Sequence, residues 1–439
     1  MLKIYSVSLG CPKNRVDTEH LLGSLGAAVR PAEHMGRADV VLINTCGFIR
    51  PAVEESVRAV LEAVHRLETL KRRPLLAVAG CMVGRYGAAE LAAEIPEVDL
   101  WLPNQQIEQW PALLAQRLGL SSPTPGRLLS TGPSYAWLKI SDGCRHACSF
   151  CTIPSIRGRH RSVPAPVLAA EAQALLDQGV RELVLVAQDV TAWGEDLGEK
   201  HGLIRLLERL LPLRGLTWLR LLYLYPAGVT PELLSFMRGA GPALLPYFDV
   251  PLQHAHPDVL GRMGRPFARD PRVVVERIRA TFPEAALRTS LIVGFPGETE
   301  AHFAALRRFV EEVRFSHMGV FAYRAEEGTP AAAMPDQVDD AVKERRRDSL
   351  MELQADISAD ALRRLPGRRA PARAGGRAAS RMAGTAHGAG LVPGPGHRRH
   401  HLHQRPRRRA RRAGGGRHRG NRGLRSDGPG LTVRRSALR

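Results

Sequence analysis

Three short apolar runs in the first 120 residues each end beside a cysteine. The runs are residues 3–9 (KIYSVSL), 39–45 (DVVLINT) and 74–79 (PLLAVA), and within two residues of their ends stand Cys11, Cys46 and Cys81. Apolar, β-branched runs that alternate with helix-like segments predict a parallel α/β sheet. The carboxyl ends of such strands lie along one edge, where ligands bind. We therefore expect the three thiols to converge, although 35 residues separate each cysteine from the next.

Three converging thiols predict a metal centre. A single free cysteine is often only a small buried hydrophobic residue, but three at the same topological position favour shared ligation, and thiolates are the usual ligands of iron–sulfur clusters. Gly10, Gly47 and Gly80 stand beside these cysteines and would let the backbone approach a bulky cluster closely. Pro12 disfavours a helical conformation at Cys11.

The other three cysteines stand together in the stretch 144–151 (CRHACSFC). Cys144, Cys148 and Cys151 are spaced so that one loop can wrap a compact cluster, which leaves one iron without a protein ligand. A structural zinc site or a ferredoxin-type electron carrier would take four ligands. His146 would be cramped as a further ligand inside the loop, and no cysteine follows Cys151. The sequence thus predicts a second, separate site with three thiols.

After this loop, strand-like and helix-like segments alternate again. The helical patterns include residues 166–178 and 299–313, and the strand candidates are 135–140, 182–187, 218–223, 247–252, 287–293 and 318–323. Six such strands predict a partial (βα) barrel with its active site at the carboxyl ends of the strands. We expect one α/β domain over residues 1–120, a linker over 121–132 and a second domain over 133–358.

Polar residues stand where several of these strands end. Each is a candidate for lining a site or for an ordinary cap or turn, and the set comprises Gln188, Asp189, Tyr225, Gln253, His254, Gly294, Gly297, Glu298, Tyr323 and Arg324. The segment 157–161 (RGRHR) follows the cysteine loop. It suits either the binding of a carboxylate or phosphate or a solvated turn, and the sequence does not decide between the two.

The net charge of +20 comes from the last part of the chain. Residues 361–439 contain 22 Arg, no Lys and one acidic residue, so that residues 1–360 carry a net charge of −1. This segment has no Phe, Trp or Tyr, so it is expected to be disordered; the alternative is a basic arm for nucleic acid. No run approaches the roughly 18 apolar residues of a membrane span, and we expect a cytoplasmic protein. In that reducing compartment six cysteines favour metal binding or catalysis over disulfides.

The three-cysteine loop resembles that of the radical S-adenosylmethionine superfamily, in which the cosubstrate chelates the open iron. Phe150 matches the aromatic residue that commonly precedes the last cysteine. With its N-terminal segments, the chain is similar over residues 1 to about 360 to the methylthiotransferases, a branch with an additional cluster domain. The matching segments are SLGCPKN with Asp17 and Glu19, NTCGFI, GCMVGRY, DGCRHACSFCTIPSIRGR, AQDVTAWG, FDVPLQHA, IVGFPGETE and EEGTPAA.

The resemblance implies a fold and a set of cofactors. The fold is an N-terminal open parallel α/β (Rossmann-like) domain followed by a radical S-adenosylmethionine domain that forms a partial (βα)6 TIM-type barrel. The cofactors are two 4Fe–4S clusters and S-adenosylmethionine. Cys144, Cys148 and Cys151 would hold the radical cluster, and Cys11, Cys46 and Cys81 the auxiliary cluster. The resemblance points to four residues for binding of S-adenosylmethionine: Phe150, Gln188, Gly294 and Glu298.

The family normally ends in a small β-barrel, the TRAM domain, and this chain departs from that pattern. The similarity fades after about residue 358, and the Arg-rich segment 359–439 stands in place of the TRAM domain. We expect a disordered basic tail there and hypothesise that a shifted reading frame produced it. Independent resequencing reads that return the same frame would contradict that hypothesis.

Three segments favour one branch of the family. They are similar to the branch that adds a methylthio group to the β-carbon of an aspartate in ribosomal protein uS12, and they comprise Pro12-Lys13-Asn14 after Cys11, Gly47-Phe48-Ile49 after Cys46 and Ala187-Gln188-Asp189. The transfer RNA branch typically has Gln-Met-Asn after its first cysteine and Ser after its second. The resemblance implies that a 5′-deoxyadenosyl radical removes hydrogen from that carbon and that the auxiliary cluster carries or donates the sulfur.

The implied partners are uS12 and an electron donor such as flavodoxin or ferredoxin, without a membrane and without a requirement for nucleic acid. Two alternatives remain open. One is a transfer RNA methylthiotransferase that acts on a modified adenosine. The other is a non-catalytic iron–sulfur protein with an RNA-binding or redox role.

Overall fold

Parallel strands form the first sheet, as the cysteine-terminated runs predict. The computed structural model describes residues 1–265 and 270–363. The strand order is β2-β1-β3-β4-β5, and all pairs are parallel. The strands are β1 (Leu2–Ser8), β2 (Val29–Pro31), β3 (Val40–Thr45), β4 (Leu75–Gly80) and β5 (Leu100–Pro103). The three expected strands are therefore β1, β3 and β4, and they are neighbours.

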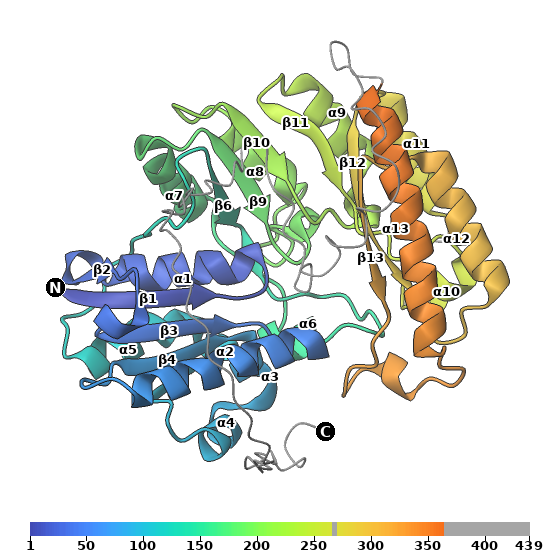
Figure 1. The fold of residues 1–439 in the computed structure, drawn as a ribbon. Helices are drawn as coiled ribbons and strands as arrows, with labels where there is room; N and C mark the ends of the chain where they lie inside the picture. Colours follow the sequence, from blue (N-terminus) through green and yellow to red (C-terminus); the bar gives the residue numbers. More distant parts are fainter. Residues whose placement is uncertain (266–269, 364–439) are drawn as a thin grey trace, which may run out of the picture. The chain divides into compact units, whose positions relative to one another are not determined.

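Alternating side chains of these strands build two hydrophobic layers. Val40 and Leu42 of β3 pack on one face with α1 and α5, whereas Val41 and Ile43 pack on the other face with α2, α3 and α4. Figure 1 shows this N-terminal sheet and its helices in blue and teal. The helices are α1 (Pro12–Ser24), α2 (Arg50–Glu68), α3 (Cys81–Tyr86), α4 (Ala88–Glu94) and α5 (Trp110–Leu118).

The second sheet has six parallel strands in their order along the chain, which confirms the partial barrel. Each strand is followed by a helix that packs against the outer face of the sheet in one large core. The strands are β6 (Tyr135–Lys139), β9 (Glu182–Val186), β10 (Trp218–Leu221), β11 (Leu244–Asp249), β12 (Ala286–Val293) and β13 (His317–Ala322). The helices are α7 (Ala165–Asp177), α8 (Gly202–Leu210), α9 (Pro231–Gly239), α11 (Pro271–Thr281), α12 (Glu300–Val313) and α13 (Asp340–Arg363). Within the described residues, none of the helices has the length and apolar character that crossing a membrane requires.

The inner face of the barrel receives α1. Trp137 of β6 and Val184 and Val186 of β9 point away from the outer helices and form a separate small core with Val16 of α1. The segment expected as a linker is also tied to α1, because Arg127 forms a buried ion pair with Glu19 at 2.7 Å. This packing fixes the carboxyl edge of the first sheet beside the start of the barrel.

The long helix α13 passes the boundary expected at residue 358. Helix α13 continues to Arg363, so residues 359–363 are helical and do not belong to a disordered tail. Its buried positions include Lys343, Arg346 and Leu350, and it packs on β13. The expectations of a lost TRAM domain and of a disordered basic tail concern residues 364–439, which lie outside the described part of the chain.

Candidate functional site

The first three cysteines stand at the carboxyl ends of three adjacent strands. Cys11 follows β1 in an extended conformation before α1, Cys46 follows β3, and Cys81 begins α3 directly after β4. Burial raises the pKa of Cys46 to about 12, and the thiols of Cys81 and Cys11 raise it further. The thiols thus lie close enough to interact, as the sheet topology predicts, and none of the chain's cysteines forms a disulfide.

The glycines beside these cysteines are required by close approach. Gly10 has a φ of +85°, and a Cβ there would lie 2.8 Å from Cβ and 2.9 Å from Sγ of Cys46. A Cβ on Gly47 would lie 2.6 Å from the carbonyl oxygen of Cys81. The three loops therefore leave space for the sulfur atoms but not for further side chains. A thiolate donor set in such a cradle fits an iron–sulfur cluster.

Replacing Gly10 by alanine should prevent a cluster from binding at Cys11, Cys46 and Cys81. Both Gly10 and Gly26 have positive φ, but an added Cβ meets Cys46 only at Gly10, whereas at Gly26 nothing lies within 4 Å. The left-handed conformation costs either alanine about 1–2 kcal/mol, so Gly26→Ala is the matched control for strain. We expect Gly10→Ala to bind about half the iron of the parent after anaerobic reconstitution and Gly26→Ala to bind all of it. Equal iron in both variants would contradict the proposed cradle.

The second three cysteines lie on the loop between β7 (Ser141–Asp142) and α6 (Ile153–Arg157). Cys144, Cys148 and Cys151 are each partly exposed, and the backbone N–H of Cys151 donates to the carbonyl oxygen of Cys148 at 3.1 Å. Burial raises the pKa of Cys151 to about 12, and the neighbouring thiols of Cys148 and Cys144 add to it. The loop therefore presents three adjacent thiols and fits a cluster with one open iron.

His146 is engaged in other contacts and does not serve as a fourth ligand. Its Nε2 lies 2.7 Å from Oδ2 of Asp189, and its ring stacks on Tyr225 at 3.6 Å between centroids. Asp189 in turn accepts from the backbone N–H of Thr191 at 2.9 Å. Asp189 and Tyr225, which follow β9 and β10, therefore hold the cysteine loop in place, a role that neither of the two expectations described.

The four residues predicted to bind S-adenosylmethionine fall into two groups. Phe150 lies edge-on to Phe295 at 6.4 Å, and Glu298 accepts from the backbone N–H of Gly294 and Phe295 at 2.6 and 3.2 Å. Gln188 lies elsewhere, with its Nε2 3.4 Å from Oδ1 of Asp142 and its buried Oε1 without a hydrogen-bond partner in the structure. Their role as cosubstrate ligands remains a prediction.

Glu298 also has a structural task. Its Oε1 accepts from Nη1 of Arg346 in α13 at 3.1 Å. Burial raises the pKa of Glu298 to about 7, against the opposing effect of Arg346 and of the two backbone donors. His254 is fully buried, and its Nε2 lies 3.7 Å from Oε2 of Glu298. Arg324, by contrast, pairs with Glu344 of α13 at 2.8 Å on the surface.

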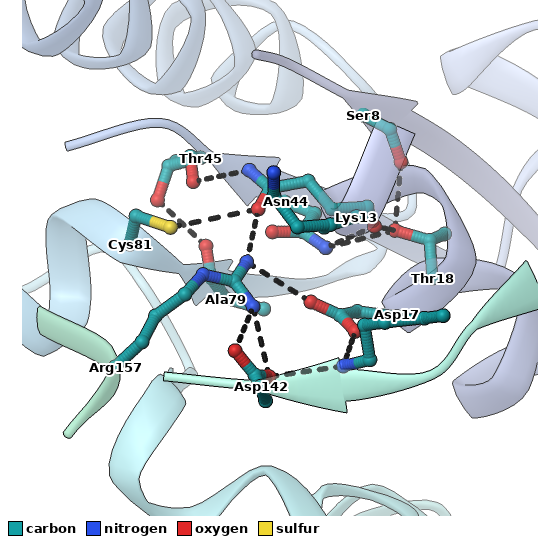
Figure 2. A network of polar contacts seen from close by, with 12 residues as sticks. Ser8, Lys13, Asp17, Thr18, Asn44, Thr45, Ala79, Cys81, Asp142 and Arg157 are labelled. Carbon is teal, nitrogen blue, oxygen red and sulfur yellow. Dashed lines mark hydrogen bonds and ion pairs between the residues drawn. The ribbon is translucent and has the colours of Figure 1, made fainter. Parts of the chain in front are cut away.

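A buried polar network that the sequence did not reveal lies between the two cysteine sites. Lys139, at the inner face of β6, donates to Oδ2 of Asp142 at 3.0 Å and forms an ion pair with Asp17 of α1. Arg157 donates to both carboxylate oxygens of Asp142 at 3.0 and 2.9 Å, to Oδ2 of Asp17 at 3.1 Å and to Oδ1 of Asn14 at 2.6 Å. Figure 2 shows the Arg157 guanidinium reaching between Asp142, Asp17 and the region of Cys81.

This network also decides between the two interpretations of the segment 157–161. Arg157 is buried and binds carboxylates, whereas Arg159 and Arg161 are exposed. Burial raises the pKa of Asp142, but Arg157 and Lys139 outweigh it and hold the pKa well below its ordinary value. The one available signal was Lys139 itself, a charged residue inside the apolar run 135–140 (YAWLKI).

The residues after Cys11 belong to the same region. Lys13 is buried, donates to the carbonyl oxygen of Ala187 at 3.1 Å and lies 4.0 Å from the centre of the Tyr223 ring. The amide nitrogen of Asn14 donates to the carbonyl oxygens of Leu9 and Thr45, both at 2.9 Å. The Pro-Lys-Asn segment thus joins two cysteine loops to each other and to the barrel.

Among the described residues, a group of metal-ligand atoms that all lie within 4.8 Å of one another is formed by His256, Asp258 and His302. Nδ1 of His256 and Nδ1 of His302 each accept a backbone N–H at 3.3 Å, from Asp258 and Thr299. That arrangement places the proton of a neutral imidazole on Nε2, so the two histidines serve as helix caps.

Known protein families match both halves of the chain. Residues 138–310 match the radical SAM superfamily and residues 3–103 match the uncharacterized protein family UPF0004. Among solved structures, the radical S-adenosylmethionine methyltransferase TsrM from Kitasatospora setae aligns over 75% of each chain with a TM-score of 0.57 and 14% identity, which supports the fold alone.

Curated relatives are much more similar. The ribosomal protein uS12 methylthiotransferase RimO of Nitratidesulfovibrio vulgaris is 76% identical over 363 residues, which cover 82% of this chain and 84% of the relative. The proteins of the same name from Oleidesulfovibrio alaskensis and Lawsonia intracellularis are 67% and 55% identical, over 82% and 84% of this chain and 84% of each relative. Because identity this high extends over both cysteine sites' domains, the chain belongs to the RimO family of radical S-adenosylmethionine methylthiotransferases.

Proposed function

We propose that this enzyme adds a methylthio group to the β-carbon of an aspartate in ribosomal protein uS12. The observation that carries the proposal is the presence of two three-thiol sites in one chain, one at the edge of the N-terminal sheet and one at the start of the barrel, joined by a buried network. Relatives up to 76% identical are named for the modification of uS12. Membership of their family extends that substrate to this chain.

The two cysteine sites have different roles in the proposed reaction. When bound, the cluster on Cys144, Cys148 and Cys151 supplies the electron that cleaves S-adenosylmethionine, and the cluster on Cys11, Cys46 and Cys81 supplies the sulfur. The chain itself ligates the clusters, buries them and fixes their relative position through α1. We propose that the cosubstrate lies against the group formed by Phe150, Gly294 and Glu298, with Gln188 on the side of Asp142.

The partners follow from this chemistry. An electron donor such as flavodoxin or ferredoxin would reduce the cluster on Cys144, Cys148 and Cys151, and the cytoplasm is the compartment in which a ribosomal protein would be modified. Neither a membrane nor a nucleic acid is needed for the reaction. A net charge of −1 over residues 1–360 supports a protein substrate, because RNA binding depends on a surplus of basic side chains.

Anaerobic turnover with purified uS12 and, separately, with transfer RNA tests the proposal. We expect mass spectrometry to find a methylthio group on one aspartate of uS12, and none on a uS12 variant in which that aspartate is asparagine. A methylthio group on transfer RNA nucleosides alone would refute the proposal in favour of the RNA branch. Failure of the reduced protein to form 5′-deoxyadenosine would favour a non-catalytic iron–sulfur protein.

A further inference from the structure

A buried cation from the barrel lies beside the first cysteine site. Arg157 comes from α6 of the second domain, and its side chain is 1% exposed. Its Nη2 donates to Oδ1 of Asn14 at 2.6 Å, and the same oxygen lies 3.5 Å from Sγ of Cys81. The guanidinium of Arg157 is therefore one intervening side chain away from a thiol of a domain to which it does not belong.

The ion-pair network around Arg157 is balanced in charge. Its cations are Arg157 and Lys139, and its anions are Asp17 and Asp142. The side chains of Asp17 and Lys139 are 1% and 9% exposed, so water screens these charges little and the loss of any one of them would act strongly on a neighbouring site. Arg157 is the cation of this network that also reaches the first cysteine site, through Asn14.

Two other buried charged side chains near these loops are each neutralised by an ion-pair partner. Arg85, whose Nη1 donates to the carbonyl oxygen of Gly47 at 3.0 Å, is paired with Glu326 at 3.0 Å. Asp249, near Lys13, is paired with Arg288 at 3.2 Å. Arg157, in contrast, reaches a thiol of the first site through a single intervening side chain, that of Asn14.

We propose that Arg157 is a positioning residue that sets the reduction potential of the auxiliary cluster from across the domain interface. The inference rests on the proposed function, which assigns a 4Fe–4S cluster to Cys11, Cys46 and Cys81. An oxidised core with two positive charges and three thiolates is negative by one charge, and loss of the Arg157 cation would leave the neighbouring network of Lys139, Asp17 and Asp142 negative as well. Net charge and hydrogen bonding to the sulfurs set the potentials of such clusters. Each electron added to the cluster is therefore stabilised by Arg157.

Two substitutions should shift the potential in opposite directions. Arg157→Met removes the cation, and we expect one-electron reduction to become at least tenfold less favourable, which corresponds to a midpoint about 59 mV lower. Asp17→Asn removes an anion and keeps most of the hydrogen-bonding geometry, so the midpoint should rise. Arg157→Lys keeps the charge and should restore most of the parent's potential. A purely structural role for Arg157 would not produce shifts of opposite sign.

The experiment uses the full chain with Cys144, Cys148 and Cys151 all changed to alanine, so that only the auxiliary cluster remains. After anaerobic reconstitution, iron and sulfide are measured, and electron paramagnetic resonance follows the reduction of the cluster by dithionite at defined potentials. The matched control is the double variant Arg85→Met with Glu326→Gln, which removes a buried contact near the same loops without a change in net charge. We expect its potential to equal that of the parent.

Each outcome of this experiment supports or overturns the proposed role of Arg157. A parent that binds no iron overturns the assignment of the cluster and the inference with it. If the parent binds a cluster and the Arg157→Met variant has the same midpoint potential, the inference alone is overturned. A shift of the midpoint potential in the Arg85→Met, Glu326→Gln control as large as that in Arg157→Met also overturns it. If Arg157→Met fails to retain its cluster, Asp17→Asn decides: a higher midpoint supports the inference and an unchanged one overturns it.

Discussion

Replacing Cys148 by alanine will abolish cleavage of S-adenosylmethionine and leave the auxiliary cluster in place. Cys148 is one of only three thiols that the loop offers, since His146 is bonded to Asp189 at 2.7 Å and cannot substitute for it. Without a third thiolate the cluster is lost, and with it the electron that starts the reaction. We expect 5′-deoxyadenosine to fall to the assay background and the iron content to fall to about half.

The matched control for this variant is Ser149→Ala. Ser149 is the next residue, and its hydroxyl donates to the carbonyl oxygen of Arg262 at 2.7 Å, so its loss perturbs the same loop but spares every thiol. We expect this control to retain both iron and cleavage. Parent-like formation of 5′-deoxyadenosine by Cys148→Ala would show that the loop does not hold the reactive cluster.

Replacing Cys46 by alanine will give the opposite pattern. Cys46 is 5% exposed, and its thiol interacts with those of Cys81 and Cys11, so its loss should empty the first site. The barrel loop is untouched, and cleavage of S-adenosylmethionine should therefore persist while methylthio transfer to uS12 stops completely. Iron analysis, 5′-deoxyadenosine and mass spectrometry of uS12 measure the three expectations on one sample.

Ser8→Ala provides the control at the same sheet edge. The Ser8 hydroxyl bonds that of Thr18 at 2.7 Å, at the end of β1 and two residues before Gly10, and it is not a metal ligand. We expect this variant to transfer the methylthio group. Methylthio transfer by Cys46→Ala at the parent's rate would refute an auxiliary cluster at this site, and loss of 5′-deoxyadenosine would show that the two sites do not function separately.

The fold was largely predictable because it depends on local patterns. Each strand that the sequence predicted in the barrel is present, and the three runs before the cysteines form adjacent parallel strands. Strands β2 and β5 were not predicted. They have three and four residues, and runs that short show no periodicity that separates a strand from a turn. They are held by their neighbours in the sheet, which local sequence does not describe.

Only the candidate ligands of the site could be predicted. Cysteine spacing singled out six thiols, and the structure places three at the edge of the first sheet and three on one loop. Their role as cluster ligands stays a prediction. The sequence could not show that Arg157 meets Asp17, 140 residues away, or that Lys139 is neutralised by two carboxylates. Which of the arginines in the segment 157–161 binds a carboxylate was equally undecided.

The sequence by itself determined the longer strands, their alternation with helices and the cysteines that are candidate metal ligands, since these follow from side-chain periodicity and from the donor atoms of cysteine. Only the tertiary structure decided how the two sites are joined. Helix α1 packs against the inner face of the barrel. Lys139 and Arg157 are buried by that contact and must pair with Asp17 and Asp142, because an unpaired buried charge is far more costly than a paired one. That requirement places a cation of one domain beside the thiols of the other.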